Sequence, residues 1–347
     1  MLLQENVSLA PLTTFKVGGP ARWFVDCSTE SEVQEAAAHA MRHNLPLFVL
    51  GGGSNLVIAD EGWPGLVLKV SIKGIEETAQ GFFRVGGGED WDSFVAHAVR
   101  KNYAGIECLS GIPGTVGGTP VQNVGAYGQE VSETIVYVRV LERATGTIME
   151  LNAAECGFFY RASIFNSSQR GRYVFTWVAY QLMKDGSPRI EYADVQKYFA
   201  GRVEAPNLQQ VRDAVREIRQ AKAMLIVEGD PDCRSAGSFF KNPLVASAEA
   251  DRIEALARQR APDKILPRYP GPDGLVKLPA AWLVEQAGFS KGYSRGPVGI
   301  SRKHSLAIVN RGSATARDIV ALKEEIQQRV LEVWGIQLQP EPELVGF

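Results

Sequence analysis

The stretch Leu45-Pro-Leu-Phe-Val-Leu-Gly51-Gly-Gly-Ser-Asn55-Leu-Val-Ile58 runs from a compact apolar strand through a glycine-rich loop into another strand-like segment. Glycine lets backbone N–H groups approach an anion closely, so this loop is a candidate phosphate cradle. It is not a dinucleotide-binding loop of the Rossmann type, because that loop must open a helix and a strand follows here. It is not a Walker A loop either, because no Gly-Lys-Ser/Thr sequence follows a strand in this chain.

A second glycine-rich stretch, Gly111-Ile-Pro-Gly114-Thr-Val-Gly117-Gly118-Thr-Pro120, has too much Gly and Pro for a helix or a central strand. We predict a buried or ligand-facing turn system there. Tight turns and bulges also need glycine, and for either cluster alone that structural interpretation is favoured. The two clusters together leave a ligand site and a structural role evenly balanced.

Length and charge restrict the class of protein. The chain has 347 residues and a formal net charge of −2, which predicts between two and three domains at about 150 residues each. A near-neutral chain has no electrostatic footprint for nucleic acid or for an anionic membrane surface. The composition, 45% apolar and 22% charged, is that of an ordinary globular protein.

Cysteine usage and hydropathy indicate the compartment. The cysteines are far apart and form no Cys-x-x-Cys pair, so neither zinc nor a disulfide framework is expected; they are Cys27, Cys108, Cys156 and Cys233. No apolar run approaches the roughly 18 residues of a membrane span, and the N-terminus does not resemble a signal peptide. We therefore expect a protein of the reducing cytoplasm.

Hydrophobic periodicity predicts a mixed α+β chain. The expected helices run from Thr29, with Glu32 in a capping box, to His43, from Trp91 to Lys101, from Asn207 to Lys222, and from Ala314 to Trp334 behind a Ser313 cap. The expected strands are Trp23–Val25, Leu45–Leu50, Leu66–Val70, Phe82–Val85, Ile135–Leu141 and Tyr173–Leu182. The segment from Glu228 to Asn242 is predicted to be irregular and polar.

Metal and triad chemistry are poor candidates. His39 and His43 have helical spacing for a metal, but no catalytic Glu lies between them, so a solvated helix face is the better interpretation. Gly-x-Ser-x-Gly is absent, and no Ser-His-Asp arrangement can be assigned.

Polar residues among aromatics and prolines are more informative. Arg161 lies among aromatic residues, Ser238 and Asn242 flank two Phe, and Glu341 stands between prolines. From the pattern alone we favour a structural Arg161–Glu341 ion pair and a turn capped by Ser238, because buried charges are usually paired. The residues by themselves predict a nucleotide-type ligand and leave the reaction open.

Taken in order, these segments closely resemble the flavoprotein family of UDP-N-acetylenolpyruvoylglucosamine reductases (UDP-N-acetylmuramate dehydrogenases, MurB), which act in bacterial peptidoglycan synthesis. The matching segments are Thr13–Gly19, Val49–Leu56, Ile112–Gly128, Tyr160–Phe165, Ala236–Pro243 and Leu338–Glu341. They extend over nearly the whole chain.

The resemblance implies an α+β architecture: an FAD-binding fold like that of the PCMH and vanillyl-alcohol-oxidase flavoproteins, in two α+β subdomains, plus a separate α+β substrate-binding domain. The implied ranges are 1–70 for subdomain 1, with the tail 335–347 packing back on it, 71–220 for subdomain 2, and 221–334 for the substrate domain. An insertion near 185–205 would carry a tyrosine that folds over the substrate, as in the tyrosine-lid form of the family.

The resemblance also implies non-covalent FAD, NADPH and a UDP-sugar as ligands. The FAD would be wrapped by Gly51, Gly52, Gly53, Ser54, Asn55, Gly111, Gly114, Gly117, Gly118, Thr119, Asn123, Gly125, Ala126 and Tyr127. The implied catalytic residues are Arg161 on the substrate carboxylate, Ser238 as proton donor, and a protonated or proton-sharing Glu341. The implied substrate contacts are Tyr160, Tyr192, Lys222, Asn242 and His304.

Two alternatives remain. One is a flavin oxidase of the same fold that passes electrons to oxygen, and the other is a non-catalytic nucleotide-sugar binding module. We expect a monomer that binds only small molecules. The chain departs from the family in a longer segment between Lys222 and Ser238, and in Glu343, where some members have a basic residue.

Overall fold

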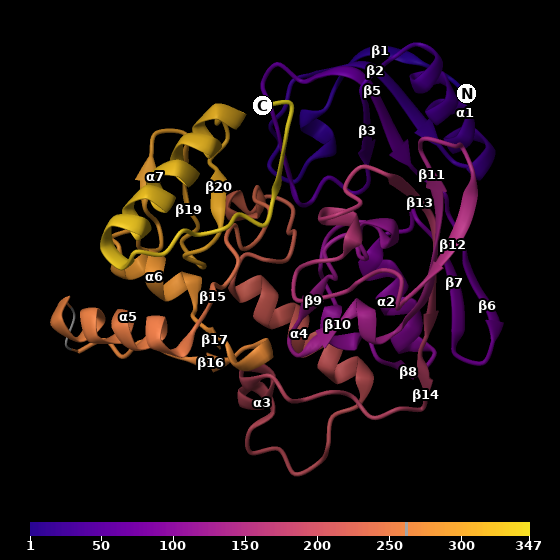
Figure 1. The fold of residues 1–347 in the computed structure, drawn as a ribbon. Coiled ribbons are helices and arrows are strands. Elements are labelled where there is room, and N and C mark those ends of the chain that lie inside the picture. The colour runs from indigo at the N-terminus through magenta and orange to yellow at the C-terminus, as the bar shows by residue number, and fades with distance from the viewer. Residues whose placement is uncertain (261–262) are drawn as a thin grey trace.

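The computed structural model describes residues 1–260 and 263–347 (Figure 1). Its N-terminal part is a four-stranded sheet in the order β1-β2-β5-β3, formed by Gln4–Ser8, Pro20–Cys27, Trp63–Val70 and Leu47–Leu50. β5 is parallel to both β2 and β3, and β1 is antiparallel to β2. Helix α1 (Glu30–Arg42) connects β2 to β3 and buries its alanine-rich face on this sheet. The expected strand–helix–strand order of this region is confirmed.

The middle part is an antiparallel sheet in the order β12-β11-β13-β7-β6. Its strands are Ile148–Asn152, Ile135–Glu142, Tyr173–Gln181, Phe82–Gly86 and Ile75–Ala79. Helix α2 (Trp91–Arg100) packs on this sheet through a core that includes Trp91, Phe94 and Tyr180. Helix α4 (Leu208–Ala221) lies beside α2, where Asp92 at the start of α2 accepts hydrogen bonds from Arg212 at 2.6 and 3.0 Å. The glycine-rich stretch after Gly111 is thereby held between sheet and helices.

The C-terminal part is built around helix α7 (Ala316–Trp334), which packs over α6 (Ala280–Gln286) and the small sheet β18-β19-β20 (Figure 1). That sheet is formed by Ser294–Arg295, Val298–Ile300 and Ile308–Asn310, and helix α5 (Ser247–Arg260) completes the layer. Its core joins Phe239 and Phe240 to the apolar face of α7. These two aromatic residues anchor the loop that carries Ser238.

The remaining elements are short. They are β4 (Leu56–Ile58), β8 (Tyr103–Ala104), β9 (Gly125–Ala126), β10 (Gln129–Glu130), β14 (Met183–Lys184), α3 (Ala193–Phe199), β15 (Leu244–Val245), β16 (Tyr269–Pro270), β17 (Val276–Lys277) and β21 (Glu343–Val345). β21 runs parallel to β4, so the tail crosses from α7 back to the N-terminal part (Figure 1). The Asp60 carboxylate, just after β4, accepts from the amides of Ala316 and Arg317 at the start of α7.

Most sequence-based elements are confirmed, with two kinds of difference. The N-cap of α7 is Thr315 and not Ser313, because Thr315 and Asp318 form a reciprocal capping box. Helices α3, α5 and α6 were not predicted. α5 buries only small or isolated apolar residues (Ala250, Ile253 and Ala257), so its periodicity is weak. The segment from Glu228 to Asn242 is irregular apart from a single 3-10 turn at Pro231–Cys233, as expected.

Candidate active site

A cavity of about 1370 Å³ lies where the three parts meet, and it is lined by both glycine-rich stretches together with Arg161, Ser238 and Glu341. Sites for one small ligand usually occupy about 300–1,000 Å³. This cavity therefore has room for an extended cofactor and a second ligand at the same time.

One wall of the cavity consists of backbone from the first glycine-rich loop. The amide N–H groups from Gly51 to Asn55 donate to no residue that the structure describes. Buried or half-buried amides are normally paired, so such a run is a ready donor set for an anion. A Cβ at Gly52 would lie 2.5 Å from the Gly114 Cα, and one at Gly53 would lie 1.9 Å from the Leu12 carbonyl oxygen. The loops approach so closely that only glycine fits at these positions.

Most of the cofactor candidates line this cavity, and two do not. Those that do are Gly51, Gly52, Gly53, Ser54, Asn55, Gly114, Gly117, Gly118, Thr119, Gly125, Ala126 and Tyr127. Gly111 donates its amide to Asp92 at 2.6 Å, and Asn123 donates to Glu130 at 2.7 Å. Both have structural partners away from the lining.

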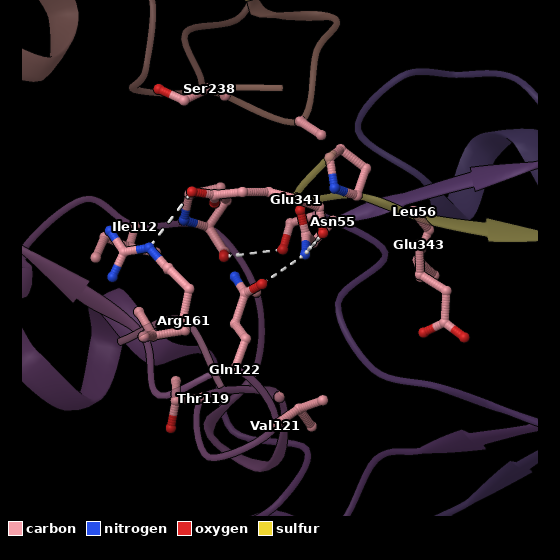
Figure 2. Close-up of a pocket in the computed structure, with 18 of the residues that line it drawn as sticks. Asn55, Leu56, Ile112, Thr119, Val121, Gln122, Arg161, Ser238, Glu341 and Glu343 are labelled. Carbon is pink, nitrogen blue, oxygen red and sulfur yellow. Dashed lines mark hydrogen bonds and ion pairs between the residues drawn. The ribbon is translucent and has the colours of Figure 1, made fainter. Parts of the chain in front are cut away.

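Asn55 ties three segments together at the centre of the site. Its side-chain amide donates to Gln122 Oε1 at 3.0 Å and to the Glu341 carbonyl oxygen at 3.1 Å (Figure 2). The first glycine-rich loop, the second one and the C-terminal tail are thus held in one arrangement.

Arg161 and Glu341 form an ion pair that lines the cavity, with the Arg161 Nε 3.4 Å from Glu341 Oε1 (Figure 2). The Arg161 Nη2 donates to the Gly125 carbonyl oxygen at 2.7 Å. Burial raises the pKa of the Glu341 carboxyl, and the positive charge of Arg161 opposes that shift. The ion pair favoured by the sequence pattern is therefore present, but it lies at a cavity wall.

Ser238 is brought beside the Glu341 segment by backbone pairing. The Glu341 amide donates to the Phe239 carbonyl oxygen at 2.9 Å, and the Lys241 amide donates to the Gln339 carbonyl oxygen at 2.9 Å. The sequence-based alternative of a turn capped by Ser238 is wrong, because Ser235 Oγ accepts the turn amide of Gly237. The Ser238 hydroxyl instead lies 2.9 Å from His304 Nε2.

His304 is half-buried and uncharged near neutral pH. Desolvation, with help from Lys222 and Lys291, lowers its pKa to about 4. The sequence analysis placed His304 against the substrate, and the structure places it against Ser238 within the same cavity.

The other substrate-contact candidates also line the cavity. Lys222 forms a 2.5 Å ion pair with Asp194 at the start of α3. Tyr192, the N-cap of α3, packs edge-on against Tyr127 with ring centroids 5.3 Å apart. Asn242 accepts the Ala280 amide at the start of α6. The Tyr160 ring lies 5.3 Å from the Arg161 guanidinium and 5.6 Å from the Lys277 ammonium.

Many lining residues were missed by the sequence analysis, among them Gln122, Asp194 and Lys277. Gln122 belongs to the second glycine-rich stretch and could have been found there. Asp194 stands near Tyr192 in a segment that had no predicted helix. Lys277 is on β17, a two-residue strand that carries no periodic signal.

The two departures in sequence leave the Arg161–Glu341 pair intact. Glu343 forms an exposed ion pair with Arg170 at 2.7 Å and points away from Arg161 (Figure 2). The segment between Lys222 and Ser238 contributes Asp230 and Asp232, which bind Ser301, Arg302 and Lys303.

Within residues 1–260 and 263–347, no His, Cys, Asp and Glu side chains cluster as metal ligands. The four cysteines are all buried and unpaired by disulfides. No helix in the described part of the chain is both long and apolar enough to cross a membrane.

A glycine-rich amide cradle without Rossmann topology, set in a large cavity, fits a cofactor-binding protein of the α+β type. A model described as an FAD binding domain matches residues 21–152, in accord with the expected PCMH-like fold class. A model described as the UDP-N-acetylenolpyruvoylglucosamine reductase C-terminal domain matches residues 230–345.

The chain belongs to the UDP-N-acetylenolpyruvoylglucosamine reductase family. It is 46% identical to the reductase of Thermobifida fusca, over 99% of this chain and 98% of that protein. It is 43% identical to that of Streptomyces avermitilis, over 99% of this chain and 94% of the relative. The crystal structure of the Thermus caldophilus reductase superposes with a TM-score of 0.68 at 26% identity, covering 99% and 100% of the two chains.

Proposed function

We propose that this chain performs its family's reaction: the NADPH-dependent reduction of the enolpyruvyl ether of UDP-N-acetylglucosamine enolpyruvate to a lactyl ether, in peptidoglycan precursor synthesis. The observation that carries the proposal is a cavity that joins Arg161, Glu341 and Ser238 to the amides of Gly51–Asn55, which have no acceptor among the described residues. Bound FAD supplies a carrier that accepts a hydride from NADPH and delivers it to the terminal enolpyruvyl carbon.

The backbone wall is suited to the cofactor. The amide run from Gly51 to Asn55 offers hydrogen-bond donors to a diphosphate, and the second glycine-rich stretch lines the cavity at Gly117 and Gly118. Neither loop contains His or Cys, so the cofactor is held without a covalent bond.

Arg161 stabilises the charge that develops on the substrate. Hydride addition to the terminal carbon pushes negative charge onto the carboxylate as an enolate, and a fixed guanidinium can bind it bidentately. Arg161 is held in place by the Gly125 carbonyl and by Glu341, so it needs little reorganisation.

Glu341 assists as a neutral acid. An ionised carboxylate beside the enolate would oppose the developing charge, whereas a protonated one can donate a hydrogen bond to it. The raised pKa of Glu341 favours this neutral form.

Ser238 donates the proton that completes the reduction. Its Oγ–H protonates the carbon next to the carboxylate and thereby fixes the configuration of the lactyl group. A hydroxyl is a weak acid, and it suffices because the carbanion-like centre is strongly basic.

The sugar diphosphate is bound at the other side of the cavity. Lys222 is suited to the diphosphate, and its ion pair with Asp194 must open as the ligand binds. Tyr192 lies above this site on α3 and acts as the lid residue. We further propose a cytoplasmic monomer, which the near-neutral charge and the buried free thiols support. The domain limits at residues 70, 220 and 334 are proposals of the same kind.

An anaerobic titration tests this function. The purified protein should be yellow, lose its flavin absorbance on addition of NADPH, and recover it only when the enolpyruvyl UDP-sugar is added. Recovery with oxygen alone at the same rate would favour an oxidase. A protein that binds the UDP-sugar but cannot be loaded with FAD would be a binding module.

A further inference from the structure

Ser238 and His304 form a preassembled pair inside the cavity, with 2.9 Å between Oγ and Nε2. Building on the proposed function, we infer that His304 is a positioning residue for proton donation: its Nε2–H donates to Ser238 Oγ, directs the Ser238 proton at the substrate carbon and stabilises the alkoxide left behind. This role differs from direct contact with the substrate, which the sequence analysis expected of His304.

The loops that carry the pair are joined by side chains. The buried Asp232 carboxylate accepts from Ser301 Oγ at 3.1 Å and from the Arg302 amide at 3.0 Å. Asp230 forms a 2.6 Å ion pair with Lys303, directly before His304. Both acidic residues lie in the segment between Lys222 and Ser238, so the segment that leads to Ser238 also holds the His304 loop.

Backbone bonds enclose the pair on both sides. The Asn310 amide donates to the Arg234 carbonyl oxygen at 2.9 Å, and the Phe239 amide donates to the Leu306 carbonyl oxygen at 2.8 Å. The latter bond joins the residue after Ser238 to a residue close to His304. The separation of Oγ and Nε2 is therefore set by the two loops and not by chance side-chain rotation.

The surroundings of His304 show in which direction the proton moves. In hydrolases with a serine nucleophile, a carboxylate orients the histidine and stabilises its charged form, so the ring removes the serine proton. Here the charges near His304 are Lys222 and Lys291, and they oppose an imidazolium, as does burial. His304 is therefore a poor base, and its neutral ring can serve Ser238 as a hydrogen-bond donor.

The step balances in protons and electrons. The electron pair of the carbanion-like centre forms the new C–H bond, while the Oγ–H bond breaks and leaves its pair on Oγ. The Nε2–H of His304 hydrogen-bonds this alkoxide and keeps its own proton. A proton from solvent restores the Ser238 hydroxyl after the product has left.

Single-turnover kinetics on the FAD-loaded enzyme test the inference. His304→Ala should slow flavin reoxidation by saturating enolpyruvyl substrate about 100-fold, the usual effect of losing one fixed donor to a developing oxyanion. Flavin reduction by NADPH should stay at the wild-type rate. His304→Gln should restore most of the loss, because its amide can donate in place of Nε2–H. His43→Ala, an exposed residue at the end of α1, is the matched control.

Each other outcome would overturn the inference. A weaker substrate affinity with an unchanged saturated rate would make His304 a substrate contact. Equal slowing of both half-reactions would make it a structural residue. If wild type itself fails to reoxidise with the substrate, the proposed function fails; if wild type turns over and His304→Ala does so equally well, only this inference fails.

A spectroscopic measurement gives an answer independent of turnover. The chain has four histidines, so ¹⁵N-labelled imidazole signals can be assigned one by one. The His304 ring should be the Nε2–H tautomer at neutral pH, and its Nε2 signal should shift in Ser238→Ala. An Nδ1–H tautomer, with Nε2 accepting from Ser238, would contradict the inference even where a variant is too unstable for kinetics.

Discussion

The two walls of the cavity are built from different material. The backbone wall, Gly51–Asn55 with Gly114–Gly118, offers backbone amides and bare Cα atoms, whereas the side-chain wall offers the side chains of Arg161, Ser238 and Glu341. A backbone wall can be changed only through steric fit. A side-chain wall can lose a chemical group and keep its shape. Substitutions should therefore separate into those that affect cofactor retention and stability and those that affect one half-reaction.

The largest effect on the side-chain wall is expected at Ser238. Ser238→Ala removes the proton donor and should slow flavin reoxidation by the enolpyruvyl substrate by roughly 10²- to 10⁴-fold. NADPH should reduce the flavin normally, because that step does not use the Ser238 proton. Stopped-flow absorbance measures both steps, and Ser238→Cys should keep most of the rate. Equal losses in the two steps would mean that a substitution in the side-chain wall is not confined to one half-reaction.

Gly52→Ala tests the backbone wall. Its Cβ would lie 2.5 Å from the Gly114 Cα, so the loops must move apart. We expect the free energy of unfolding of the apoprotein to fall by about 1–3 kcal/mol, as for an overpacked site, together with a lower flavin content. Gly118→Ala is the control for stability, since its Cβ would meet only Thr115 Oγ1, at 3.8 Å. Chemical denaturation measures the free energy of unfolding of both variants. Equal values for Gly52→Ala and Gly118→Ala would refute the steric argument.

Glu341→Gln tests the neutral acid. The variant keeps a donor but cannot share a proton, so flavin reoxidation should slow roughly 10-fold. Because burial raises the pKa of Glu341, the wild-type rate of this step should fall as pH rises through that raised pKa. The variant should lack this decline. A pH series of single-turnover rates measures it, and identical profiles would show that the Glu341 carboxyl is structural.

The smallest effect is expected at the lid. The Tyr192 ring packs on Tyr127, and Phe would keep that packing while losing the hydroxyl. Tyr192→Phe should therefore raise KM for the UDP-sugar a few-fold, as expected for the loss of one hydrogen bond. The variant should show little change in kcat. Steady-state kinetics tests this split, and an effect confined to kcat would remove Tyr192 from substrate binding.

The sequence predicts the backbone wall better than the side-chain wall. Glycine clusters after an apolar strand are visible in sequence because the steric demand is local, and Gly51–Asn55 was found in that way. The Ser238–His304 contact joins residues 66 positions apart and depends on two irregular loops. No periodicity marks such loops, so only the folded chain shows the partner.

The ends of the helices show the same difference between local sequence signals and contacts made by distant residues. The Asn207 cap and the apolar face of α4 were predictable, since both signals lie within the helix itself. Ser313 and Thr315 compete for one N-cap, and Asp60, some 250 positions away, binds the α7 amides next to Thr315. The pairing of Arg161 with Glu341 could be guessed from residue type. The position of this ion pair at a cavity wall could not be guessed, because it depends on the tail running back along the Ser238 loop.

That return of the tail has a consequence for biosynthesis. Asn55 hydrogen-bonds the Glu341 carbonyl group across 286 positions of sequence. At about 5–20 residues per second on the ribosome, the glycine loop waits roughly 15–60 s before its partner is made. A nascent chain can thus fold its first sheet early, but its active site cannot close until the tail emerges. Premature termination anywhere before Glu341 should yield protein that lacks reductase activity, so translation errors would not release a partly active enzyme.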